Sequence, residues 1–552
     1  MPRVRVDNLG RIGVIKDTPA TDLPPEAWTS LQNARATEGG MEKFYGDILT
    51  LGTDSAALSV QPYWLAYAQS PTTAYWIYFG AGKIYVRSSA DPWTNTDITR
   101  ASGGDYAATE DVKWNGGMFG GIYIANNGID IPQYWAAINP ATKMANLTAW
   151  DSNRRAKVIR PYGRFLVALN LTVSGVNYPH DVLWSHPADA GNIPNSWDET
   201  LTTKDTGRNS LSDSQGLLVD GLQLRDTFII YKEDATWAMQ LIGGQYIMKF
   251  TRVLKESGLM APNCVTHFKN NAEMHFAVGT DDIYVHNGQT AQSILEKKLR
   301  KWLFNAIDGT YYKRSFVVPY PTRSEIWFCF PESGQTQPTM ALVWNWQDNK
   351  FSQRDLCKIT TTNGTRSTVA TQGVTCIAPG VVSSSTNAAW SGDSEAWDSD
   401  TSTWEQRDYS PLNYQLLAAD RSGSKRIYNM DSTTQFDGTN YRVMFERVGL
   451  SIIGRDREGQ PKNDNEVVKL LTELWPRFEG TAGTEVSIEI GTQMGVNDAT
   501  DWGTPFTFTI GSQQKINPYR SGKFISLRFS WSGSTWARLV NYEMQIESVG
   551  TY

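Results

Sequence analysis

The stretch "AYWIYFGAGKIYVRSS" (74–89) places two runs of aromatic and β-branched residues on either side of Gly-Ala-Gly. Aromatic and β-branched side chains favour strands, and glycine favours the tight turn of a hairpin. The stretch therefore predicts two antiparallel strands joined by a short turn. Similar pairs of runs recur along the chain, at 117–135, 162–187, 226–241, 272–288 and 324–356.

The spacing of these hairpins predicts how they assemble. Their centres lie about 40–55 residues apart, which is about the length of one four-stranded propeller blade. Small sheets with two apolar faces bury both faces when they stack around an axis, and only short edges stay exposed. We expect roughly 6–8 blades on this spacing, and we assign residues 56–440 to a β-propeller-like domain.

The composition indicates an all-β chain with more than one domain. The 552 residues include 21 Trp, 24 Tyr and 20 Phe, with 46 Gly and 24 Pro to mark turns. A single core stops growing at roughly 250–300 residues, so a second domain is expected. The net charge of −6 gives the chain no general attraction to nucleic acid.

The cysteines and the N-terminus argue against several classes of protein. Cys264, Cys329, Cys357 and Cys376 are scattered without a C-x-x-C pair, which indicates reduced thiols rather than a disulfide framework or a zinc knuckle. The first residues, "MPRVRVDNLGRIGVIK", lack the continuous apolar segment of a signal peptide. No run of about 18 apolar residues occurs, so we expect no membrane span and no membrane partner.

The C-terminal part has a different pattern. From residue 441 the predicted strands are longer and alternate apolar with polar side chains, as in "TEVSIEIGTQ" (484–493) and "KFISLRFSWSG" (523–533). Alternation with a period of two is typical of a sheet with one buried face. Residues 441–552 are therefore expected to form a compact antiparallel β-sandwich.

Two further segments lie within the propeller-like part. In "AQSILEKKLRKWLFNAI" (291–307), apolar residues such as Ile294, Leu299 and Leu303 recur at helical spacing and predict a helix. Its other side carries four basic side chains, Lys297, Lys298, Arg300 and Lys301. These indicate either a solvated face or a contact with nucleic acid or another subunit. Residues 380–410, rich in Ser, Thr, Asp and Trp, predict an exposed loop.

The sequence shows no constellation typical of an enzyme. Its five histidines have no metal-ligand spacing such as H-E-x-x-H, and neither G-x-S-x-G nor a phosphate-binding P-loop occurs. One motif, Ser391–Trp397, resembles the Asp box of sialidase-type propellers, but Glu395 stands where that box has Gly. We expect no catalytic residue, cofactor or metal. Tryptophans in loops leave sugar binding open, although such residues also pin hairpin ends.

The stretch "TDLPPEAWTSLQNARATEGGMEKFYGD" (21–47) indicates a family. Leu23-Pro24-Pro25 leads into a short turn, Asn33–Ala36 alternates as a strand, and Glu38-Gly39-Gly40 turns the chain back. This order resembles the N-terminus of podovirus tail nozzle proteins, also called tail tubular protein B or packaged-DNA stabilisation proteins. Gly39-Gly40 replaces the Asp-Gly turn that is usual in that family.

Three later stretches support the resemblance. Residues 279–304 are similar to the family's hairpin and helix, with Asn287-Gly288 at the turn, and 342–356 are similar to the strand-turn-strand that follows. Residues 491–530, which include Arg520, match its final β domain. The resemblance thus covers both ends and the middle of the chain, and the loop at 380–410 has no counterpart in it.

The resemblance implies a structural protein of a short phage tail, made in the host cytoplasm and located in the virion. It implies a hexameric ring below a tail adaptor ring, through which double-stranded DNA passes without specific binding. A tail fibre or needle is a further candidate partner. Residues 1–55 are expected to join a platform with residues 441–552 of their own or a neighbouring subunit. Six residues are candidates for the platform or subunit interface: Trp28, Asn33, Arg35, Arg300, Trp302 and Arg520.

Two other functions stay open. A carbohydrate-binding or glycan-cleaving propeller that recognises a receptor would stack sugars on Trp390, Trp397 or Trp404. A scaffolding propeller of a bacterial complex would need no ligand site. Thermal stabilisation by saccharides distinguishes the first function, and viral gene neighbours distinguish the nozzle from the second.

Overall fold

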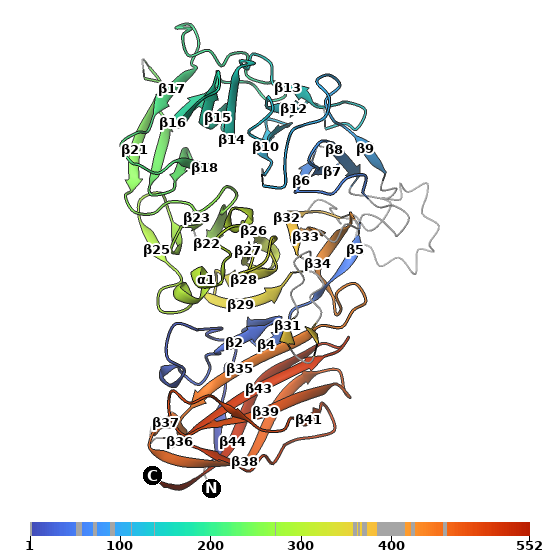
Figure 1. Cartoon of the computed structure of the whole chain (residues 1–552), viewed down its shortest axis with the longest axis vertical. Helices are drawn as coiled ribbons and strands as arrows, with labels where there is room; N and C mark the ends of the chain where they lie inside the picture. The colour runs from blue at the N-terminus through green and yellow to red at the C-terminus, as the bar shows by residue number, and fades with distance from the viewer. Residues whose placement is uncertain are drawn as a thin grey trace, which may run out of the picture.

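The computed structural model describes residues 3–50, 58–69, 74–88, 94–111, 113–136, 138–244, 246–270, 272–356, 361–362, 365–366, 373–382, 414–420, 425–455 and 461–551. In these ranges nearly all regular structure is antiparallel strand. Small sheets stand in a ring, and a sandwich of two larger sheets lies below it (Figure 1). The expected all-β fold, a propeller-like body with a sandwich platform built by both ends of the chain, is confirmed.

Each blade of the ring has four strands in antiparallel order, and in all but one blade these four strands are a separate sheet. Blade 1 contains β6 (Trp64–Gln69), β7 (Ala74–Phe79), β8 (Ile84–Ser88) and β9 (Asn95–Asp97). Blade 2 contains β10 (Asn115–Phe119), β11 (Ile122–Asn126), β12 (Gln133–Trp135) and β13 (Ala145–Asn146). Blade 3 contains β14 (Arg154–Tyr162), β15 (Phe165–Val173), β16 (Val176–Trp184) and β17 (Gly207–Ser210). Blade 4 contains β18 (Leu218–Leu224), β19 (Thr227–Lys232), β20 (Thr236–Leu241) and β21 (Met248–Leu254).

The last three blades complete the ring. Blade 5 contains β22 (Val265–Asn270), β23 (Ala272–Val278), β24 (Ile283–His286) and β25 (Ala291–Ser293). Blade 6 contains β26 (Phe316–Tyr320), β27 (Glu325–Phe330), β28 (Met340–Asn345) and β29 (Lys350–Asp355). Blade 7 contains β32 (Val374–Gly380), β33 (Gln415–Asp420), β34 (Ile427–Thr433) and β5 (Gly46–Thr50). The described strands thus form seven blades, within the expected number.

Blade 7 closes the ring with strands from distant parts of the chain. Its outermost strand, β5, pairs with β34, with Ile48 opposite Asn429. An unpaired edge on β34 would leave backbone groups without partners, and β5 supplies them. We expected the whole arm 1–55 to join the platform, but β5 belongs to the propeller.

Two sheets form the platform. One contains β1 (Arg3–Val6), β3 (Ala34–Thr37), β4 (Gly40–Lys43), β38 (Val467–Gly480), β42 (Arg520–Gly522) and β44 (Ala537–Thr551), and is continuous with blade 6. The other contains β2 (Ser30–Gln32), β35 (Arg442–Leu450), β39 (Glu485–Gln493), β40 (Asp501–Trp502), β41 (Phe506–Thr509) and β43 (Phe524–Ser532). Short pairs are β30 (Thr361–Thr362) with β31 (Thr365–Arg366), and β36 (Ile452–Arg455) with β37 (Pro461–Asn463).

The arm is part of the platform core. Trp28 is 1% exposed and packs edge-on against Phe445, with ring centroids 4.9 Å apart. Its indole N–H donates to the carbonyl oxygen of Leu9 at 2.8 Å. The two ends of the chain lie side by side at the base of the platform, where β1 pairs with β44 (Figure 1). Residues 3–43 therefore bury their apolar side chains against the C-terminal strands of the same chain.

The predicted helix at 291–307 is shorter than expected. Ala291–Ser293 is β25, the fourth strand of blade 5, and α1 spans only Arg300–Ala306. Lys297 has φ +59°, in the left-handed region, which a continuous α-helix does not tolerate. Pairing with β24 therefore overrides the helical spacing at the start of this segment.

Several predictions lie outside the described residues. They include most of the loop at 380–410, the Ser391–Trp397 motif, the tryptophans Trp390, Trp397 and Trp404, and Cys357. The remaining three cysteines are buried free thiols. Within the described ranges, the structure has no helix with the length and apolar character that a membrane span requires.

Candidate functional site

The hairpin of β3 and β4 connects the propeller to the platform. On one side β3 pairs with β29 of blade 6, with Ala34 opposite Gln353. On the other side β4 pairs with β44, with Met41 opposite Leu539. The hairpin therefore makes blade 6 and one platform sheet continuous. The buried polar residues around it form the junction, which is the candidate functional site.

Asn33 precedes this hairpin and bonds to both parts of the molecule. Its side-chain oxygen accepts a hydrogen bond from the Asp355 backbone N–H at 2.8 Å, and its amide donates to the Asp355 carboxylate at 3.0 Å. The same amide donates to the carbonyl oxygen of Arg442 at 2.9 Å. Asn33 has φ +51°, a conformation that Asn tolerates better than most residues. Asn33 thus fixes the end of blade 6 beside the start of β35.

Arg35 is the central charge of the junction. It is 3% exposed and forms ion pairs with Glu325 of β27 at 2.8 Å and with Asp431 of β34 at 2.8 Å. Its guanidinium also lies over the ring of Phe44, at 4.2 Å from the centroid. Burial alone would lower the pKa of Arg35, but Asp431 and Glu325 outweigh it and raise that pKa above its ordinary value. Arg35 therefore stays charged while it joins the platform arm to blades 6 and 7.

A second buried ion pair lies beside the first. The Arg354 guanidinium of β29 donates to the carboxylate of Asp47 on β5, and the Asp431 backbone N–H donates to the same carboxylate at 3.3 Å. Arg323 adds a third cation, 2.9 Å from Asp431. Burial raises the pKa of Asp47, while Arg354 acts in the opposite direction. Removing one partner of such a pair leaves a buried charge without compensation, which is strongly destabilising.

Lys43 fastens the same hairpin to the platform. Its ammonium donates to the carbonyl oxygens of Thr434 at 2.7 Å and Gly533 at 2.6 Å, one from the propeller side and one from the platform. It also lies 4.2 Å from the ring centroid of Tyr441. Because these partners are neutral, burial is uncompensated and lowers the pKa of Lys43 to about 8.

The arm also contacts α1. The Asp17 carboxylate accepts from the backbone N–H groups of Lys301 at 2.6 Å and Trp302 at 3.0 Å, and so caps the first turn of the helix. The ammonium of Lys16 lies 3.9 Å from the ring centroid of Trp302. Asp17 is not among the predicted interface residues, because no local pattern marks an acid that caps a helix 284 positions away. The segment with the basic side chains thus contacts the N-terminal arm of its own chain.

The six candidate residues occupy different surroundings. Trp28, Asn33 and Arg35 are buried within the chain. Trp28 packs in the platform core, while Asn33 and Arg35 join platform and propeller of one subunit. Arg300 forms an exposed ion pair with Asp281 at 2.6 Å, next to Trp302. Arg520 lies apart from all of them on β42, where it binds the carboxylate of Asp501 at 2.7 Å. Four candidates, Trp28, Asn33, Arg35 and Trp302, therefore lie along the contacts of the arm, whereas Arg300 pairs with Asp281 and Arg520 with Asp501.

Polar side chains also link blades that are not neighbours in the ring. Arg160 of blade 3 donates to the Asp220 carboxylate of blade 4 at 2.7 and 2.8 Å and to the Asn263 side chain, which precedes blade 5, at 2.7 Å. Lys113, just before blade 2, donates to the carbonyl oxygens of Arg314 at 2.6 Å and Ser315 at 3.1 Å, just before blade 6. Since blades 2 and 6 are not neighbours, these contacts link opposite parts of the ring.

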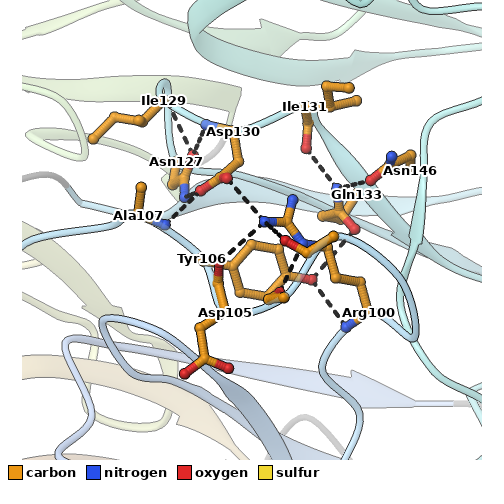
Figure 2. Close-up of polar contacts among 12 residues, drawn as sticks. Arg100, Asp105, Tyr106, Ala107, Asn127, Ile129, Asp130, Ile131, Gln133 and Asn146 are labelled. Carbon is orange, nitrogen blue, oxygen red and sulfur yellow. Dashed lines mark hydrogen bonds and ion pairs between the residues drawn. The ribbon is translucent and has the colours of Figure 1, made fainter.

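A third polar cluster joins blades 1 and 2 (Figure 2). Arg100 donates to the Asp130 carboxylate at 3.1 Å and to the carbonyl oxygen of Asp105 at 3.1 Å, and lies over the ring of Tyr106. The Tyr106 hydroxyl donates to the side chain of Gln133 at 3.3 Å. Burial raises the pKa of Tyr106 above its ordinary value. Arg100 thus holds the segment that connects the two blades against blade 2, and these hydrogen bonds all join residues of the chain to one another.

Trp197 and Trp502, two tryptophans that follow or precede polar residues in the sequence, contact other side chains of the fold. Trp197 is 1% exposed and packs against Trp150, with ring centroids 4.7 Å apart. Trp502 has the Arg528 guanidinium 3.9 Å from its ring centroid. In the part of the chain that the structure describes, no group of three or more His, Cys, Asp or Glu side chains is placed to hold a metal ion.

Comparison with known proteins gives distant structural likenesses. No family model and no curated protein matches the chain. A quinonprotein alcohol dehydrogenase-like protein from Bacteroides thetaiotaomicron is similar with a TM-score of 0.32 and 9% identity, over 54% of this chain and 67% of that one. Apo AztD from Citrobacter koseri has a TM-score of 0.29 and 11% identity, over 55% of this chain and 87% of its own. Both likenesses are too distant to indicate an activity or a ligand.

Proposed function

We propose that this chain is a structural subunit of a short bacteriophage tail, a nozzle that forms a hexameric ring below the tail adaptor and helps to retain and release the genome. The proposal starts from the order of motifs that resembles podovirus nozzle proteins at both ends and in the middle of the chain. The observation that carries it is the platform, in which residues 3–43 and 442–551 of one chain form a single sandwich.

The junction supports a mechanical role. Arg35, Arg354 and Arg323 neutralise Glu325, Asp431 and Asp47 in the interior, and the β3–β4 hairpin makes the two parts one continuous sheet. A junction with buried ion pairs holds one relative orientation, because separating the partners leaves charges without compensation. A ring subunit under the pressure of packaged DNA needs such a fixed propeller.

The charge and the polar contacts between blades support a conduit formed between subunits. Arg160 and Lys113 link blades that are not neighbours in the propeller, so under this proposal DNA follows the axis of the assembled ring instead. The net charge of −6 suits this role, because a strongly basic bore would hold the phosphates and slow their passage.

Electron microscopy of the purified chain, alone and mixed with the tail adaptor, tests the proposal. We expect six-fold rings, or rings that form once the adaptor is added, and the chain should be found in virions by mass spectrometry. A chain that stays monomeric with the adaptor and is missing from virions would exclude the nozzle function. A saccharide that raises the melting temperature would instead favour the glycan-binding propeller.

A further inference from the structure

A buried chain of hydrogen bonds joins blade 4 to blade 5. Tyr231 lies on β19, His275 on β23 and His286 on β24, and each is 0% exposed. The Tyr231 hydroxyl lies 2.8 Å from Nδ1 of His275 and 2.6 Å from Nε2 of His286. The two histidines are opposite each other on neighbouring strands, with ring centroids 5.3 Å apart. One tyrosine of blade 4 is therefore held by two histidines of blade 5.

The backbone fixes where each ring proton lies. The N–H of Gly288 points at Nδ1 of His286 at 3.1 Å, and since an N–H only donates, the proton of His286 is on Nε2. The carbonyl oxygen of Gln223 lies 3.1 Å from Nε2 of His275, and since a carbonyl only accepts, the proton of His275 is also on Nε2.

These constraints leave a single pattern of donors and acceptors. Nε2–H of His286 donates to the Tyr231 hydroxyl oxygen, and the Tyr231 O–H donates to Nδ1 of His275. Every ring nitrogen and the hydroxyl are then bonded while both rings are neutral. An added proton on His286 would face the N–H of Gly288, and one on His275 would face the Tyr231 O–H. The pattern therefore fails when either ring becomes charged.

The surroundings oppose a positive charge on these rings. Burial lowers the pKa of His275 to about 3, with a smaller contribution from His286, and burial lowers the pKa of His286 to about 4. The nearby carboxylate of Asp220 already accepts hydrogen bonds from Nε and Nη2 of Arg160, at 2.8 and 2.7 Å, and from the backbone N–H of Asn263. The strands of this interface also carry other titratable or charged groups: Lys232 on β19, His267 and Lys269 on β22, Glu273 on β23, Tyr284 on β24, Asp220 on β18 and Arg225 after β18.

We propose that Tyr231, His275 and His286 form an acid-sensitive latch between blades 4 and 5, closed while both rings are neutral and opened when either ring takes up a proton. The apolar contacts of the same interface, such as Ile229 with the buried side chains of blade 5, do not depend on pH. Acid therefore loosens this interface while the other blades keep their packing. The latch is independent of the nozzle function.

Nitrogen NMR of the full chain labelled only at histidine tests the tautomer and the protonation of each ring. The chain has five histidines, so the spectrum contains few signals to assign. At neutral pH we expect both latch rings as Nε2–H tautomers, assigned through His275→Asn and His286→Gln. Both should stay neutral through the ordinary histidine value of 6.5 and take up protons near the values of about 3 and about 4. An Nδ1–H tautomer of either ring, or titration of both near 6.5, overturns the proposal.

Hydrogen exchange measured by mass spectrometry tests the opening. Between about pH 7 and about pH 4, after correction for intrinsic rates, exchange in β19, β23 and β24 should rise about tenfold more than in blade 2. His286→Gln removes the ring that takes up a proton at the higher pH, about 4, so its opening should move to lower pH. His267→Asn, an exposed residue of the same blade, is the matched control. Equal loosening of all blades, or an unmoved opening in His286→Gln, overturns the proposal. If that variant does not fold, the NMR titration of the wild type decides.

Discussion

Arg35 and Asp431 lie 396 positions apart in the sequence and form a buried ion pair of 2.8 Å. Arg35 comes from the N-terminal arm, and Asp431 from the last propeller strand before the platform begins. Their contact, together with Glu325, links three parts of the chain at one point.

Removing Arg35 should lower the free energy of unfolding of the chain. Arg35→Met leaves the buried Glu325 without its cation and leaves Asp431 with Arg323 alone, so we expect a loss of about 3–5 kcal/mol in the free energy of unfolding by urea. Arg300→Met breaks an exposed pair with Asp281 and is the control, with an expected change of about 0–1 kcal/mol. Equal losses in the two variants would show that the buried pair does not stabilise the junction.

Releasing the arm from α1 should expose it to protease. Asp17→Ala removes the carboxylate that caps Lys301 and Trp302, at a cost of about 0.5–2 kcal/mol. We expect trypsin to cleave after Lys16 several times faster than in the wild type, while the propeller stays intact. Asp7→Ala, which removes an exposed partner of Arg5, should leave the rate unchanged. Cleavage at the wild-type rate in Asp17→Ala would mean that other contacts hold the arm.

The sequence predicts the local elements well because strand patterns are local. The run at 74–89 became β7 and β8, and the alternating runs after 441 became the long platform strands. The helix predicted over 291–307 was wrong at its start, because the pairing of Ala291–Ser293 with β24 is a tertiary contact that helical spacing does not indicate.

The junction could not be predicted from the sequence in the same way. Arg35 is one polar residue in a short alternating strand, and its partners lie 290 and 396 positions away. Closure of blade 7 by β5 likewise depends on pairing between Ile48 and Asn429. The position of the arm on the platform could be predicted only from the resemblance to a family. The histidine latch leaves no spacing pattern in the sequence, because its residues come from two blades.

The buried cysteines should be unreactive in the folded chain. Burial raises the pKa of Cys264 and of Cys376 to about 12, and raises that of Cys329 as well. The thiolate is the reactive form, so we expect maleimide to modify these three residues slowly in buffer and quickly in urea. Peptide mapping assigns each site, and rapid modification of Cys264 in buffer would indicate that the propeller opens often.

Lys43 should make the stability of the junction depend on alkaline pH. Its pKa is about 8 in the folded chain and 10.5 when unperturbed. Between these values the unfolded chain holds more protons than the folded chain, so raising the pH favours folding. We therefore expect the stability of the wild type relative to Lys43→Met to increase from about pH 8 to 10.5. Below about pH 8 both states are protonated and the difference should be constant, which provides an internal control. Urea unfolding across this range measures the difference, and a flat profile would show that Lys43 keeps its proton between the carbonyl oxygens of Thr434 and Gly533.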